Sequence, residues 1–209
     1  MGAVHIPVSH GRLEGLLSEV ESPRAAALVC HPHPLYGGNM HHHIPYRLAD
    51  AFRQAGVTVL RFNFRGVGLS TGAYDEGRGE VEDAAAALEL LSRQAPGVPL
   101  IASGFSFGSW VAFELARRDA RVEKALGVGI PLELMPFSFV ESLPKPKALV
   151  HADADEYGRL SEVRALLARA PEPKALFVVE GADHMCLGRL GELSRQAAEA
   201  VAWLLQSGR

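Results

Sequence analysis

The sequence predicts an α/β fold, with a mostly parallel β-sheet covered by helices on both faces. Three observations support this fold class. From residue 25 onward, strand-like apolar runs alternate with amphipathic segments of helical periodicity, which is typical of a parallel sheet with helical crossovers. Most of these runs are continuously apolar, as in strands buried on both faces. The composition, with 48% hydrophobic and 22% charged residues in 209 positions, suits a single globular domain over residues 1–209.

The chain begins with a segment that predicts a β-hairpin. Residues 3–21 alternate between apolar and polar side chains on both sides of Ser9-His10-Gly11, and a turn between two alternating runs is a hairpin signal. Residues 25–31, AAALVCH, follow as a run of small apolar side chains. Such a run predicts a strand in the interior of the sheet.

The first predicted helix covers residues 44–56. Ile44, Leu48 and Phe52 recur at every fourth position and share one face, and Gly56 supplies a stop signal. The same reasoning extends along the rest of the chain. Strands are predicted at 57–64, 98–105, 122–130, 147–153 and 174–181, and helices at 79–94, 107–118, 159–170 and 191–206.

Charge and composition exclude several classes of function. The formal net charge of −3 does not favour binding to nucleic acid or to an anionic membrane, and no apolar run is long enough to span a bilayer. The first residues lack the basic and apolar regions of a secretory signal, so we expect a cytoplasmic protein. Cys30 and Cys186 are expected to be reduced thiols, because disulfides are rare in the cytosol.

Residues 104–108, GFSFG, match the pattern G-x-S-x-G. A predicted buried strand precedes the pattern and a predicted helix follows it, which is the context of a nucleophile elbow. Glycines on both sides of Ser106 remove β-carbons that would crowd such a sharp turn. The alternative is a glycine-rich turn in which Ser106 only caps the following helix.

A nucleophilic serine needs a general base, and the base needs a carboxylate that orients it. On a sheet of this kind, the order along the chain is serine, acid and histidine, each in a loop after a strand. Asp153 and Asp155 lie just past one predicted strand, and His184 lies just past the next. Asp155 is preferred because it lies further beyond the strand. The sequence therefore predicts Ser106, Asp155 and His184 as the catalytic residues.

Three sequence blocks together resemble those of a family of small bacterial α/β-hydrolases. They are HPHPLYGGNMHH at 31–42, RFNFRGVGLSTG at 61–72 and GFSFGS at 104–109. The resemblance covers nearly the whole chain and implies an α/β-hydrolase fold and esterase-like serine hydrolase activity. It also matches Asp155 to the position of the acid. One departure is Ala152, where relatives often carry a turn glycine.

The stretch at 30–43 contains five of the nine histidines in the chain. It follows the strand whose loop supplies one amide of the oxyanion hole in this fold. The two prolines of the loop have no N–H group, so His33 and Leu35 offer the nearest amides. The resemblance favours the amide of His33. The second amide is that of Phe107, the residue after the serine.

The histidine-rich stretch does not predict a metal site. His31 and His33 are separated by a proline, and the run at 41–43 lacks the i, i+4 pairing of a helical zinc site. We therefore expect no metal and no other cofactor. We interpret these histidines as groups that hydrogen-bond the loop and line the pocket.

The glycines at 65–72 are similar to a dinucleotide-binding loop, but their spacing differs from that motif. The next predicted helix also begins too far away to hold a pyrophosphate. We expect instead a packed loop in which Arg65 pairs with Asp75, Glu76 or Glu80.

Together these features predict a carboxylesterase-like hydrolase that acts on a small-molecule acyl substrate. Thioester, amide and peptide substrates stay open as variants of the same chemistry. A binding protein that uses the hydrolase fold without turnover is the alternative from a different class. Whether the chain forms a homo-oligomer is left open.

Residues 131–146 stand where larger members of the superfamily insert a lid. This segment is too short for a helical cap but long enough for an apolar flap. We therefore predict minimal or no lid, and an open cleft whose walls include Leu35, Tyr36, Met135 and Phe137.

Overall fold

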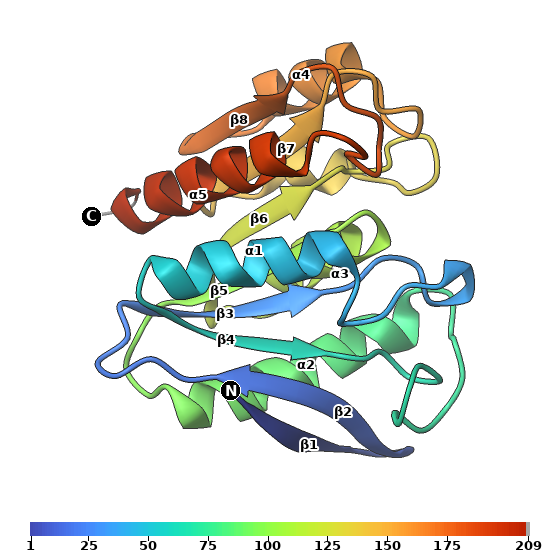
Figure 1. The fold of residues 1–209 in the computed structure, drawn as a ribbon, viewed down its shortest axis with the longest axis vertical. Helices are drawn as coiled ribbons and strands as arrows, with labels where there is room; N and C mark the ends of the chain where they lie inside the picture. Colours follow the sequence, from blue (N-terminus) through green and yellow to red (C-terminus); the bar gives the residue numbers. More distant parts are fainter. Residues whose placement is uncertain (208–209) are drawn as a thin grey trace.

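The computed structural model describes residues 1–207, which form one eight-stranded β-sheet (Figure 1). The strands are β1 (Gly2–Val8), β2 (Gly11–Ser18), β3 (Ala25–Cys30), β4 (Val57–Phe62), β5 (Leu100–Phe105), β6 (Val122–Val128), β7 (Lys147–Ala152) and β8 (Lys174–Val179). Their order across the sheet is β1-β2-β4-β3-β5-β6-β7-β8. β1 and β2 form an antiparallel hairpin, β2 is antiparallel to β4, and the other neighbouring pairs are parallel.

Helices cover both faces of the sheet. They are α1 (His43–Gln54), α2 (Arg78–Gln94), α3 (Phe107–Arg118), α4 (Leu160–Arg169) and α5 (Leu190–Gln206), with two short 3-10 helices, η1 (Pro34–Tyr36) and η2 (Ser138–Ser142). α1 and α5 lie side by side on one face, and α2, α3 and α4 cover the other (Figure 1). None of the helices in the described part of the chain is long and apolar enough to cross a bilayer.

The burial of the strands and helices follows the patterns in the sequence. All six residues of β3 are buried, while burial in β2 alternates and includes Leu13 and Leu17. On α1, Leu48 and Phe52 pack into the core that this helix shares with α5. The predicted fold class, including the N-terminal hairpin, is confirmed. β8 differs from the inner strands, because it is an edge strand in which Val179 is buried and the other side chains are half-buried.

Residues 131–146 form turns and the short helix η2 rather than a helical cap. Phe137, Val140 and Leu143 are buried in the core on the α2–α4 face, and other apolar side chains of the segment pack against that core. Leu134 stays exposed. The expectation of minimal or no lid is therefore confirmed.

An ion pair that the sequence did not identify fastens the loop after β4. Arg65 donates from Nε and Nη2 to the buried carboxylate of Asp83 on α2, at 3.1 and 2.8 Å. Of the predicted partners, Asp75 approaches Arg65 only to 4.0 Å. Glu80 caps α2 instead, and Glu76 pairs with an arginine of that helix. The pairing with Asp75 was predicted, but the closer partner Asp83 was missed, because several acids follow the loop and the sequence alone does not reveal which turn of α2 faces Arg65.

Candidate active site

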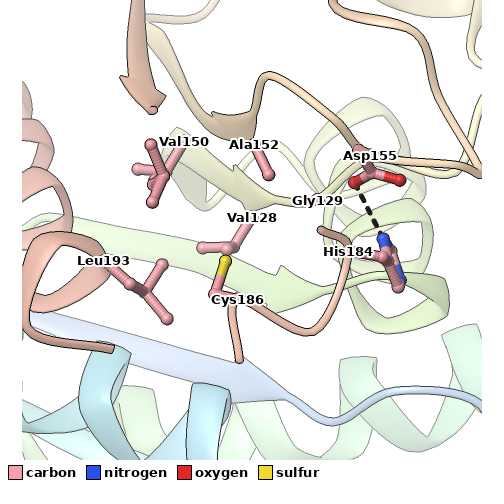
Figure 2. Close-up of a pocket in the computed structure, with 9 residues that line it drawn as sticks. Val128, Gly129, Val150, Ala152, Asp155, His184, Cys186 and Leu193 are labelled. Atoms are coloured by element: carbon pink, nitrogen blue, oxygen red, sulfur yellow. Dashed lines mark hydrogen bonds and ion pairs between the residues drawn. The ribbon is translucent and has the colours of Figure 1, made fainter. Parts of the chain in front are cut away.

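Three loops at one edge of the sheet bring Ser106, Asp155 and His184 together. The loops follow β5, β7 and β8, which belong to the parallel part of the sheet, so their carboxyl ends meet at the same edge. His184 Nε2 lies 3.0 Å from Ser106 Oγ, and His184 Nδ1 lies 2.8 Å from Asp155 Oδ2. Figure 2 shows the imidazole of His184 turned toward the carboxylate of Asp155. The three side chains selected from the sequence form one hydrogen-bonded chain.

Ser106 occupies a sharp turn between β5 and α3. Its backbone angles, φ 54° and ψ −123°, are disfavoured for any residue other than glycine. A β-carbon on Gly104 would lie 2.2 Å from the carbonyl oxygen of Gly108, and one on Gly108 would lie 2.4 Å from the carbonyl oxygen of Cys30. Only glycine fits at these two positions. The side chain of Ser106 makes no capping hydrogen bond to α3, which argues against a merely structural serine.

Asp155 fixes the orientation of the His184 imidazole. Its Oδ2 accepts from His184 Nδ1–H, and its Oδ1 accepts from the amide of Tyr157 at 2.9 Å. Because Nδ1 carries the hydrogen, Nε2 offers a lone pair to the hydroxyl of Ser106. Asp153, the other candidate acid, is exposed and accepts a backbone amide of the next loop at 3.2 Å. The geometry therefore favours Asp155.

A second histidine, missed in the sequence, packs behind the carboxylate. His151 is buried, and its Nε2–H donates to the carbonyl of Gly158 at 2.6 Å. The same Nε2 lies 3.7 Å from Asp155 Oδ2. Burial lowers the pKa of His151, so the ring stays neutral and does not compete with His184 for the negative charge of Asp155.

Apolar packing closes off the back of the His184–Asp155 pair. Figure 2 shows Cys186 beside Val128. Together with Val150 they line a narrow crevice that has no room for a water molecule. Exclusion of water strengthens the hydrogen bond between imidazole and carboxylate. Burial raises the pKa of the Cys186 thiol to about 12, so this cysteine stays protonated and is no nucleophile.

At the site, the backbone amides of Phe107 and His33 make no hydrogen bond within residues 1–207. Phe107 is the first residue of α3, where the helix leaves its amides unpaired. In the histidine-rich loop, the amide of Leu35 donates to His33 Nδ1 at 3.2 Å. Of the two loop amides that the sequence left open, that of Leu35 is occupied and that of His33 is free.

A pocket of about 470 Å³ opens beside Ser106 and His184, a volume typical of small-molecule sites. Its walls carry aromatic, aliphatic and imidazole groups and no Asp, Glu, Lys or Arg side chain. They are Pro32, His33, Tyr36, His42, Phe105, Ser106, Phe107, Pro131, Leu134, Met135, Tyr157, His184 and Met185.

Of the four predicted wall residues, Tyr36 and Met135 line this pocket, whereas Leu35 and Phe137 lie elsewhere. The side chain of Leu35 is 66% exposed on η1. Phe137 is buried in the core, where its ring meets that of Phe113. The sequence places both side chains near the site, but the direction of each is set by turns that it does not specify.

His42 lines the pocket, as expected for the histidine-rich stretch, but sequence reasoning missed Phe105, Tyr157 and Met185, among others. These three stand within two positions of Ser106, Asp155 or His184. Adjacency to the predicted catalytic residues was therefore a signal that could have found them.

The histidine-rich stretch builds the loop beside the pocket. His31 Nδ1–H donates to the carbonyl of Pro32 at 2.6 Å, and its Nε2 accepts from the amide of Phe64 at 3.0 Å. His43 Nε2–H donates to the carbonyl of Met185 at 3.1 Å. In the described part of the chain, no group of three or more His, Cys, Asp or Glu side chains could hold a metal ion.

The buried neutral state of His31 should make the protein less stable in mild acid. Burial lowers the pKa of His31 from 6.5 to about 4, so between these values the unfolded chain binds a proton that the native state does not. The stabilisation is fully present above pH 6.5 and is lost as the pH falls toward 4. The contribution of His31 to the free energy of unfolding should fall by about 3 kcal/mol over this range.

Urea unfolding across this pH range measures the effect. His31→Gln, in which the amide oxygen still accepts from Phe64, should be less stable but show a shallower dependence on pH. A chemical shift of the His31 ring that titrates near its ordinary pKa would contradict the expectation.

Sequence and structure comparisons agree with this geometry. A family model described as serine aminopeptidase, S33 (Hydrolase_4) matches residues 21–129, which include the serine turn. An uncharacterized protein of Rickettsia prowazekii is 36% identical over 205 residues, which are 93% of this chain and 86% of that protein.

Two solved structures extend the match over nearly the whole chain. An alpha-beta serine hydrolase homologue from Coxiella burnetii has 32% identity and a TM-score of 0.88, with 95% of this chain and 96% of that chain covered. XC6422 from Xanthomonas campestris, described as a member of the α/β serine hydrolases without lid, has 29% identity and a TM-score of 0.88, with 100% and 96% covered. The chain therefore belongs to the small bacterial α/β serine hydrolases, as its three sequence blocks indicated.

Proposed function

We propose that this protein hydrolyses carboxylic esters of small molecules through an acyl-enzyme formed on Ser106. The observation that carries the proposal is the unbroken hydrogen-bonded chain from Asp155 through His184 to Ser106. The free amides of Phe107 and His33 support it, as does the strained backbone of the serine, for which a protein that only binds a ligand has no use.

The geometry assigns each group a role in acyl transfer. Ser106 Oγ attacks the ester carbonyl while His184 Nε2 takes its proton, and Asp155 stabilises the imidazolium that forms. The amides of Phe107 and His33 donate to the oxyanion of the tetrahedral intermediate. His184 then passes the proton to the leaving alcohol. Water repeats the sequence on the acyl-enzyme, which releases the carboxylic acid and restores the serine.

The description of the matching family model raises peptide hydrolysis as a second candidate. An aminopeptidase must bind the protonated α-amino group of its substrate, and an ammonium in a pocket requires a carboxylate partner. The wall residues of this pocket include no acid, and the carboxylate of Asp155 is buried behind His184. The uncharged walls therefore favour an uncharged ester over an amino-terminal peptide.

Two chromogenic substrates test the proposal. The purified protein should hydrolyse p-nitrophenyl butanoate and leave alanine p-nitroanilide unchanged. A fluorophosphonate probe should label Ser106 in parallel. Preferred cleavage of the anilide would replace the esterase by an aminopeptidase. No labelling and no turnover would favour a binding protein on the hydrolase fold.

Acyl chain length should matter in a defined way. We assign the wall formed by Pro131, Leu134 and Met135 to the first carbons of the acyl chain, where each buried methylene contributes about 0.8 kcal/mol. No helical cap encloses a longer chain. For p-nitrophenyl esters, kcat/KM should therefore be highest for acyl groups of about two to six carbons, the part that burial favours. A steady climb to about twelve carbons would instead reveal a covered tunnel.

A further inference from the structure

His42 lies at the wall of the pocket with one ring nitrogen engaged in the fold. It is the N-cap residue of α1, and its Nδ1 accepts from the amide of Ile44 at 3.3 Å. The ring stacks on His43 at 4.3 Å and on Phe105 at 5.5 Å between centroids. Helix capping and stacking together fix the position and the tautomer of this imidazole.

Because Nδ1 accepts, the hydrogen of the neutral ring resides on Nε2. Burial beside His43 and His184 lowers the pKa of His42 to about 4, so the ring is neutral at ordinary pH. Nε2 has no hydrogen-bond partner within residues 1–207. Among the described residues, one fully buried side-chain nitrogen or oxygen lacks a hydrogen-bond partner, and it is Nδ1 of His151. Nε2 of His42 also lacks a partner but is not among such buried atoms. Nε2 of His42 is therefore accessible, and its ring lines the pocket.

The same donor lies on the side of the site where the alcohol of an ester must leave. His184 gives its proton to the leaving oxygen, so the alcohol extends from Ser106 toward His184. The ring of Phe105 contacts that of His184 at 4.9 Å between centroids and also carries His42. The two histidines are thus neighbours on one aromatic surface.

We propose that Nε2–H of His42 is a specificity-determining donor that selects esters whose alcohol portion carries an uncharged hydrogen-bond acceptor, such as an ether, carbonyl or hydroxyl oxygen. This inference rests on the proposed ester hydrolysis and adds the substrate class. The acceptor replaces the water that otherwise solvates Nε2–H, whereas an apolar alcohol displaces that water and leaves the donor unpaired.

Matched substrate pairs measure this selection. The methoxyethyl and n-butyl esters of butanoic acid differ by one oxygen in the alcohol. Ethyl hexanoate and its analogue with an ether oxygen next to the end of the acyl chain differ by one oxygen in the acid. The ratio of kcat/KM within each pair, divided by the same ratio for alkaline hydrolysis, isolates the contribution of the protein. For the alcohol pair, this corrected ratio should favour the ether by about three- to tenfold. For the acyl pair, the corrected ratio should be near one.

Two substitutions separate the donor from the structural roles of His42. Asparagine caps helices well, so His42→Asn keeps the cap but loses the ring. With its oxygen held in the cap, its shorter amide group does not reach the position of the Nε2–H donor. His42→Phe keeps the stacking but loses the cap and the donor. Both should bring the alcohol-pair ratio close to one. If His42 acted only by capping α1, the alcohol-pair ratio would change only in His42→Phe. If it acted only by packing, the ratio would change only in His42→Asn. His41→Asn, an exposed neighbour outside the pocket walls, is the control and should keep the wild-type ratio.

These experiments distinguish failure of the His42 donor role from failure of the proposed ester hydrolysis. If the wild-type protein hydrolyses none of these esters, the esterase proposal itself fails. If it hydrolyses both members of the alcohol pair with equal corrected kcat/KM, or if the two His42 variants keep the wild-type ratio, the donor role is overturned. A preference confined to the acyl pair would overturn the assignment of His42 to the alcohol side.

Discussion

Ser106→Ala should lower kcat for ester hydrolysis by on the order of 10⁶, the loss typical of removing the nucleophile from a serine triad. The reason is chemical, because without Oγ no acyl-enzyme can form. The fold should survive, since alanine keeps the β-carbon of the turn and loses only the hydrogen bond to His184. Initial rates with p-nitrophenyl butanoate at saturating substrate measure the effect.

Thermal unfolding of the same preparation is the control for the serine variant. Its midpoint should stay close to that of the wild-type protein, so that the loss of rate cannot be assigned to unfolding. Turnover by the folded variant at a rate near wild type would eliminate the acyl-enzyme on Ser106.

Asp155→Asn should lower kcat by on the order of 10⁴, because an amide cannot stabilise the imidazolium or hold the required tautomer of the base. Asparagine has the same shape as aspartate, so the packing around the side chain is kept. The hydrogen bond from the amide of Tyr157 can also be kept by the amide oxygen.

Asp153→Asn is the matched control for the acid. Asp153 is exposed and accepts a backbone amide, a role that the asparagine oxygen can continue. We expect less than about a tenfold change in kcat, because surface substitutions away from the site have small effects. A larger loss for Asp153→Asn than for Asp155→Asn would show that the wrong aspartate was chosen.

The features visible in the sequence are those that depend on local pattern and on order along the chain. Continuous apolar runs identified the inner strands, such as β3, because a strand buried on both faces carries mostly apolar side chains. Ser106, Asp155 and His184 were identifiable because a parallel sheet brings the loops after its strands to one edge. The choice of catalytic residues rested on their positions relative to strand ends and, for Asp155, also on the resemblance to the family.

The features that could not be predicted from the sequence depend on the direction of a side chain in three dimensions. The carboxylate that binds Arg65 belongs to Asp83, one helical turn beyond Glu80, and only the packing of α2 decides between the two. The inward turn of Phe137 and the outward turn of Leu35 follow from the geometry of short 3-10 helices and their flanking turns. The tautomer of His42 depends on a hydrogen bond to the start of α1. None of these leaves a periodic signal.

The position of β8 has a consequence for how activity is lost on heating. This edge strand is mostly half-buried and precedes the loop that carries His184, whereas Ser106 follows β5 in the middle of the sheet. Edge elements with little burial open locally at lower free energy than the core. Such opening would withdraw the general base while leaving the serine turn intact. Catalysis should therefore cease, reversibly, at temperatures where the central strands are still folded.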